Sequence, residues 1–72
     1  MFIKSQSNGT IINFDRVCFI RKWSDYCSNN VYPKIEFYYS GTDCDFWKYN
    51  SVEERDEEFK KIEKLLNVIQ FN

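Results

Sequence analysis

Residues 51–66 read SVEERDEEFKKIEKLL, and this stretch decides the fold. Ser51 with Glu54 three residues later forms a capping box, in which the two residues satisfy each other's free backbone N–H groups. Acidic residues fill the first turns and lysines follow, which is the order that the helix dipole favours. An apolar stripe recurs at helical spacing: Val52, Phe59, Ile62, Leu66 and Ile69. The sequence therefore predicts an amphipathic helix over about residues 52–69, whose apolar stripe needs a partner.

Short runs of β-branched and aromatic residues precede this helix, as is typical of strands. They cover residues 1–4, 10–14, 17–23, 31–39 and 43–49, with Asn8-Gly9 marking a hairpin turn. The polar stretch 24–30 is expected to be the longest loop. The predicted fold class is α+β: a four- to five-stranded antiparallel meander over residues 1–49, packed by the C-terminal helix in a single domain of 72 residues.

Alternation along the strands predicts which side chains share a face. In residues 31–39, Ile35 and Phe37 share one face, and the opposite face carries Tyr32, Lys34, Glu36 and Tyr38. Pro33 cannot donate a backbone hydrogen bond, so it marks a strand start or an edge. Residues 17–23 are apolar on both faces, which is typical of a covered strand. In residues 43–49 either face could point inward, because both carry aromatic residues.

One helix can cover only one face of a small sheet, and the chain contains 19% aromatic residues. The aromatic surplus predicts a partner site. Its candidate binding or interface residues are Trp23, Tyr32, Lys34, Tyr38, Trp47 and Tyr49. Four uses remain open: a homo-oligomer interface (a dimer above all), stacking of nucleic-acid bases, a pocket for a small planar ligand, or simple cover by the termini and the 24–30 loop.

The acidic start of the helix is a second candidate surface. It contains Glu53, Glu54, Asp56, Glu57 and Glu58. The simplest interpretation is a solvated face that caps and solubilises the helix. The alternative is an acidic docking surface that competes for a basic cleft.

Composition excludes several kinds of chemistry. Without histidine, Ser-His and Cys-His nucleophile pairs are excluded. Gly9 and Gly41 fall in turns, so no phosphate-binding loop is expected. Three cysteines are a poor zinc site, and Cys18 and Cys44 are expected to be buried thiols, with Cys27 in a polar loop as the alternative site of an intermolecular disulfide. We expect no enzyme activity, no metal and no cofactor.

Ten basic and eleven acidic residues give a net charge of −1, which disfavours nucleic acid as the main ligand. The chain shows neither an apolar run long enough to span a membrane nor the pattern of a signal peptide. We therefore expect a cytoplasmic protein without membrane contact. A chain this short is marginally stable by itself, which favours a homodimer.

The stretch Phe46-Trp47-Lys48-Tyr49, followed by residues 51–59 and Ile62-Glu63-Lys64-Leu65-Leu66, resembles short orphan proteins of AT-rich bacteria and their phages. These proteins combine a strand meander with a capped acidic helix. The resemblance implies the same fold and, for some phage members, a role as an inhibitor of a host immunity factor or a sponge for its small-molecule signal. The architecture is also similar to dimeric single-stranded-DNA-binding coactivators, but this chain lacks their basic charge.

These observations lead to a functional expectation. The chain is expected to be a small, non-catalytic binding protein that occupies or sequesters a partner. The alternative is a dimer that binds single-stranded nucleic acid with the aromatic residues of its sheet.

Overall fold

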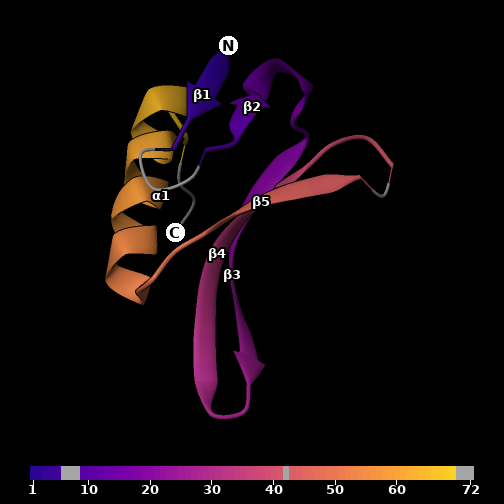
Figure 1. The fold of residues 1–72 in the computed structure, drawn as a ribbon. Helices are drawn as coiled ribbons and strands as arrows, with labels where there is room; N and C mark the ends of the chain where they lie inside the picture. Colours follow the sequence, from indigo (N-terminus) through magenta and orange to yellow (C-terminus); the bar gives the residue numbers. More distant parts are fainter. Residues whose placement is uncertain (6–8, 42, 70–72) are drawn as a thin grey trace.

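The computed structural model describes residues 1–5, 9–41 and 43–69 and shows an α+β fold with two antiparallel sheets and one helix (Figure 1). Strands β1 (Phe2–Lys4) and β2 (Ile11–Asn13) form the small sheet, and a 3₁₀ turn, η1 (Phe14–Arg16), follows. Strands β3 (Phe19–Cys27), β4 (Asn30–Tyr38) and β5 (Cys44–Lys48) form the second sheet in the order β3-β4-β5. Helix α1 spans Val52–Leu66.

The expectation of a single meander is wrong, because the chain changes sheets between β2 and β3. Residues 14–16, expected to include a bend, form the 3₁₀ turn η1, in which the Asn13 side chain accepts from the Asp15 N–H. This turn redirects the chain, and the Phe14 side chain enters the core. The predicted turn at Asn8-Gly9 includes a residue outside the described part of the chain.

The long loop expected at residues 24–30 is also wrong. β3 continues to Cys27, and Cys27 pairs directly with Asn30. Only Ser28 and Asn29 connect the strands, with φ values of 49° and 68°. Two consecutive residues with positive φ match the right-handed twist of a hairpin, and asparagine tolerates this conformation better than most residues.

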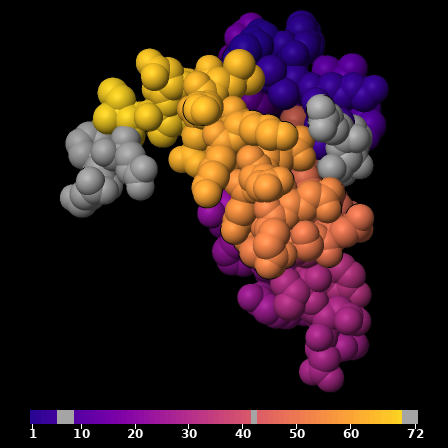
Figure 2. Space-filling view, turned by 90° about the vertical axis from the view of Figure 1, so that its left-hand side faces the viewer, coloured from indigo at the N-terminus to yellow at the C-terminus, as the bar shows by residue number. Residues whose placement is uncertain are grey.

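Strand β4 is the central strand, yet it contains Pro33. β5 pairs only with residues Lys34 to Tyr38, so β4 has no second neighbour beyond Pro33. The Pro33 carbonyl accepts from the Tyr49 N–H at 3.0 Å, which places the proline nitrogen on the side where β5 ends. The expectation of a strand start or an edge is therefore wrong, because Pro33 is the fourth residue of the central strand and lies where β5 ends. The part of the β3–β4 hairpin beyond Pro33 projects away from α1 (Figures 1 and 2).

Helix α1 starts as predicted, and the Ser51 hydroxyl accepts from the Glu54 N–H at 3.1 Å. It ends at Leu66 rather than near Ile69, because Asn67 adopts the left-handed conformation (φ 54°, ψ 52°). The Val68 N–H then donates to the Glu63 carbonyl, which closes the helix end. Of the predicted stripe, Ile62 is buried and Phe59 half-buried, whereas Leu66 and Ile69 are exposed.

The core lies between α1, the small sheet and one face of the β3-β4-β5 sheet. Its buried apolar side chains are Ile12, Phe14, Ile35, Phe37, Trp47, Tyr49 and Ile62. Phe37 packs edge-on against Trp47, with ring centroids 4.6 Å apart. The three cysteines are free and exposed, so the expectation that Cys18 and Cys44 are buried is wrong. Among the described residues, no helix is both long and apolar enough to cross a bilayer.

Candidate functional site

The sheet face that points away from α1 is the candidate binding surface, and we call it the open face. The register aligns Trp23 with Lys34 and Lys34 with Lys48, so alternate residues of the three strands share this face. Its members are Phe19, Arg21, Trp23 and Asp25 from β3; Tyr32, Lys34, Glu36 and Tyr38 from β4; and Cys44, Phe46 and Lys48 from β5.

Aromatic rings dominate the open face. Phe19, Trp23, Tyr32 and Phe46 are each 44–55% exposed. Phe19 stacks on Tyr38, with ring centroids 4.4 Å apart and an angle of 11° between the planes. Helix α1 does not cover these rings, and a cluster of partly exposed aromatic side chains of this kind is typical of a partner site.

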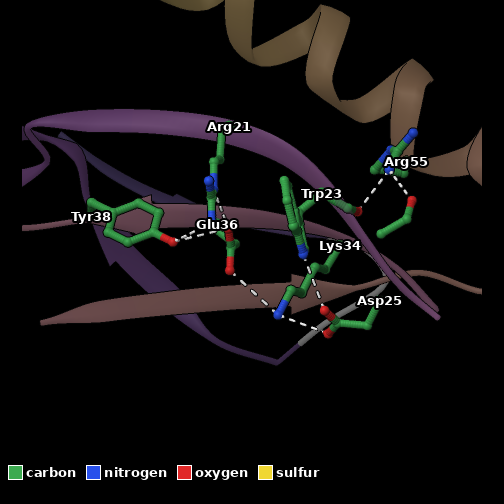
Figure 3. A network of polar contacts seen from close by, with 8 residues as sticks. Arg21, Trp23, Asp25, Lys34, Glu36, Tyr38 and Arg55 are labelled. Carbon is green, nitrogen blue, oxygen red and sulfur yellow. Dashed lines mark hydrogen bonds and ion pairs between the residues drawn. The ribbon is translucent and has the colours of Figure 1, made fainter. Parts of the chain in front are cut away.

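Charged groups lie between the rings and contact Trp23, Tyr38 and Phe46. Glu36 lies at the centre, 92% buried as a side chain, and its carboxylate accepts from Arg21 Nε (2.5 Å) and from the Tyr38 hydroxyl (3.0 Å). Lys34 Nζ lies 3.4 Å from Glu36 and 3.0 Å from Asp25. Figure 3 shows these groups as one connected row across the strands.

Arg21 has a second role as a stacking partner. Its guanidinium carbon lies 4.3 Å from the centre of the Trp23 ring and 5.3 Å from that of Tyr38. The Trp23 indole N–H donates to Asp25 at 3.1 Å, which fixes the ring from its other end. Lys34 lies 5.0 Å from the centre of the Phe46 ring. These cation–π contacts order the face before any partner arrives.

The network also sets the ionisation state of its acidic and basic groups. Burial alone would raise the pKa of Glu36, but hydrogen bonds from Arg21, Tyr38 and Lys34 outweigh burial and hold that pKa below its usual value. Its hydrogen bond from Lys34 lowers the pKa of Asp25, and the same contact raises the pKa of Lys34. At neutral pH the acids are therefore ionised acceptors rather than proton donors.

The structure brings together four of the six predicted binding residues. Trp23, Tyr32, Lys34 and Tyr38 lie on the open face. Trp47 and Tyr49 do not: both face α1, and Trp47 is 0% exposed. Their prediction as surface residues is wrong, because β5 places Trp47 beside Ile35 and Phe37 in the core. The phenol of Tyr49 is also buried, which raises its pKa.

Sequence reasoning missed Phe19, Arg21 and Phe46 as members of the site. Phe19 and Arg21 have the same parity as Trp23, so alternation along β3 was a usable signal. Phe46 gave none, because the sequence left the orientation of its strand open. Only the pairing of Phe46 with Glu36 places it on the open face.

The acidic start of α1 lies on the other side of the sheet. Asp56 is partly neutralised by Arg55 (3.1 Å) and Lys22 (3.6 Å). Arg55 is itself buried, and its Nη1 donates to the Trp23 carbonyl (2.8 Å) and the Ser24 hydroxyl (2.9 Å), so it ties α1 to β3 (Figure 3). Glu53 and Glu57 are exposed, and Glu54 and Glu58 are half-buried.

Two shallow grooves flank α1. One of about 380 Å³ lies against β1 and is lined by Lys4, Glu57, Glu58 and Lys61, among others. The other, of about 390 Å³, has apolar walls that include Val17, Phe59 and Leu66. In the described ranges, no three Cys, Asp or Glu side chains gather in a way that could hold a metal ion.

The open face can therefore contribute ring surface, cation–π contacts and fixed charges of both signs, which is the chemistry of recognition. A scan of protein-family models and searches of the curated proteins and the solved structures found no match to this chain.

Proposed function

We propose that this chain is a non-catalytic binding protein that captures a partner protein on the open face and acts by occupying that partner. One observation carries the proposal. Four half-exposed aromatic rings lie on the face that α1 leaves uncovered, and Arg21, which the Glu36 network holds, stacks on one of them, Trp23.

The residue types support a protein partner. Tryptophan, tyrosine and arginine supply most of the binding energy in protein interfaces, because they combine large area with few rotatable bonds and a polar end. The open face provides all three: Arg21 and Trp23 lie two residues apart on β3, and Tyr32 lies opposite Asp25, diagonally across from Trp23. The charges of the open face are already paired within the chain, so covering them costs less than desolvating free ions.

Occupation of a partner surface also fits the proposed mode of action. A domain that supplies recognition groups and no proposed nucleophile can inhibit its partner by blocking a surface that the partner needs. We include inhibition of a host factor in the proposal, in keeping with the phage proteins that the sequence resembles.

The test is an affinity capture from an extract of the native host with three baits. Wild-type protein and Tyr26→Ala should enrich the same partner, whereas Trp23→Ala should reduce its recovery by roughly tenfold or more, the effect of an interface hot spot. Tyr26 is the matched control, since it is a 79% exposed aromatic residue on the same strand but on the opposite face. Equal recovery by all three baits would place binding elsewhere, and turnover of a substrate by the pure protein would contradict the non-catalytic role.

A second candidate function is the binding of single-stranded nucleic acid. The observation that favours it is the position of Arg21, Lys34 and Lys48 among the rings, with the acidic residues of α1 on the opposite side of the sheet. Bases stack on exposed aromatic rings, and cations near them contact phosphates. Trp23 reports directly on such binding, because the other tryptophan, Trp47, is buried. Salt-sensitive quenching of Trp23 fluorescence by oligonucleotides at ~0.15 M salt would make this the leading function.

A further inference from the structure

The outer edge of β3 is open along the whole strand. β3 runs over nine residues and pairs with β4 alone, and no other described strand lies against its second side. An open strand edge is a template on which another strand can add. This edge includes the hairpin end that projects beyond α1 (Figure 2).

The backbone bonds of the neighbouring strands show which β3 groups are free to pair. The Tyr39 N–H donates to the Asp43 carbonyl, and the Tyr49 N–H donates to the Pro33 carbonyl, so odd-numbered β4 residues direct their backbone groups to β5. Even-numbered β4 residues then bond to odd-numbered β3 residues. The remaining β3 residues direct their backbone groups outward: Ile20, Lys22, Ser24 and Tyr26.

We propose that a second copy of this chain adds antiparallel to this edge, β3 against β3, to form a two-fold dimer centred on Trp23. Trp23 is the midpoint of Phe19–Cys27, so this register uses every residue of the strand. Lys22 then lies opposite Ser24 of the second copy, and Ile20 opposite its Tyr26. These are the residues whose backbone groups point outward, so the two edges match in hydrogen bonding as well as in length.

Charge complementarity selects this register. With Trp23 at the centre, Arg21 of each copy lies opposite Asp25 of the other, and opposite charges directly across two strands stabilise the pair. A centre at Lys22 would place two lysines face to face, and a centre at Arg21 would do the same with two arginines. A centre at Ser24 would lose both Arg21–Asp25 pairs. The charges that would otherwise protect an exposed edge from pairing thus attract a second copy in one alignment.

The small size of the chain also favours a dimer, and the dimer enlarges the open face. A domain this small buries little of its surface by itself, and pairing places the half-exposed Trp23 rings of the two copies side by side on the joined open face. Two three-stranded sheets become one sheet of six strands, with both helices on one side and both open faces on the other. This interface differs from the sequence-based expectation, which used Trp47 and Tyr49, because each chain buries both in its own core.

Light scattering and a disulfide trap together test the proposal. Wild-type protein at ~100 μM should give twice the 8.8 kDa chain mass. In a background with Cys18, Cys27 and Cys44 changed to serine, Trp23→Cys should cross-link to itself under mild oxidation. Residues opposite each other in a pair without hydrogen bonds have Cα atoms ~4.5 Å apart, within the range of a disulfide. Tyr26→Cys is the matched control, since the two copies of residue 26 would lie roughly 20 Å apart.

A blocking variant gives an independent measurement. Lys22→Pro removes an outward N–H without loss of a bond to β4, and in a two-fold dimer it removes two intermolecular hydrogen bonds. The dissociation constant should rise roughly tenfold or more, with an unchanged circular dichroism spectrum. Monomer mass for the wild type, or equal cross-linking of Trp23→Cys and Tyr26→Cys, would overturn the proposal. A monomer that still captures a partner through the open face would refute the dimer and leave the proposed function standing.

Discussion

Replacement of Glu36 by glutamine tests whether the polar network organises the open face. The variant keeps the side-chain shape and one carbonyl oxygen, which can still accept from Arg21 and Tyr38. It removes the negative charge and turns an amide N–H₂ group toward Lys34, 3.4 Å from the second carboxylate oxygen. Two donors then face each other beside a side chain that is 92% buried.

The expected cost follows from these contacts. A hydrogen bond to a charged group contributes about 1 kcal/mol more than a neutral one. Loss of that increment at Arg21 and Tyr38 is partly offset because a neutral amide is easier to bury than a carboxylate. We expect the free energy of unfolding to fall by about 1–2 kcal/mol, which lowers the melting temperature of a domain this size by roughly 5–15 °C.

Urea denaturation at pH 7 measures this cost, and Asp25→Asn is the matched control. Asp25 also pairs with Lys34, but its side chain is 54% exposed, so its loss should cost clearly less. Glu36→Gln should also weaken the stacking of Arg21 on Trp23, because the bond that positions Arg21 loses its charge, and near-ultraviolet circular dichroism reports this change. Equal losses of stability for the two variants would refute the central role of Glu36.

The pH dependence of the free energy of unfolding separates the effect of the Glu36 charge from that of its packing. The pKa of Glu36 is lowered from its usual value of 4.5 in the folded chain, so its contribution is complete above that value and disappears as the pH falls through the folded-state pKa. The stability gap between wild type and Glu36→Gln should therefore shrink when unfolding is measured at about pH 3 instead of pH 7. A gap of the same size at both pH values would show that shape, and not charge, produces the effect.

Three further substitutions test the fold. Trp47→Ala should destabilise the chain by about 3–5 kcal/mol and abolish cooperative thermal unfolding, because it empties the centre of the core; a near-native melting curve would contradict the core assignment. Ser51→Ala should cost about 1 kcal/mol in urea denaturation through loss of the helix cap, and an unchanged midpoint would argue against that cap. Asn67→Ala should cost about 1 kcal/mol in the same assay, because the left-handed conformation of residue 67 penalises alanine. Asn67→Gly should be neutral or stabilising, and equal stability of the two variants would argue against a left-handed helix end.

The start of α1 could be predicted to the residue because a helix cap is a local contact between Ser51 and Glu54. The hairpin end of β3 could not, because its side chains are exposed on both faces and show no apolar alternation. A polar run without periodicity suggests a loop, and only the pairing with β4 makes it a strand. The left-handed Asn67 was a readable signal for the helix end, since asparagine is a common residue at that position.

The candidate site was likewise predictable from the sequence only in part. Alternation in β4 correctly grouped Tyr32, Lys34, Glu36 and Tyr38, since a covered strand has a two-residue period. In β5 neighbouring aromatic residues point in opposite directions, and the contact of Trp47 with Phe37 decides which of them enters the core. That contact joins residues on two different strands, so the local sequence pattern around Trp47 does not predict it.

At one end of the β3–β4 hairpin β5 completes a three-stranded sheet, and at the turn end the two strands pair only with each other. Beyond Pro33 it has neither β5 beside it nor α1 above it, so its amides should exchange with solvent through small local openings, while those of Ile35 and Phe37 exchange only when the whole domain unfolds. The open face spans this boundary, with Tyr32 on the looser side and the Glu36 network on the firmer side. A partner would therefore meet a surface that is rigid at Arg21 and adjustable at Tyr32, and its arrival should register as slowed amide exchange confined to the hairpin tip.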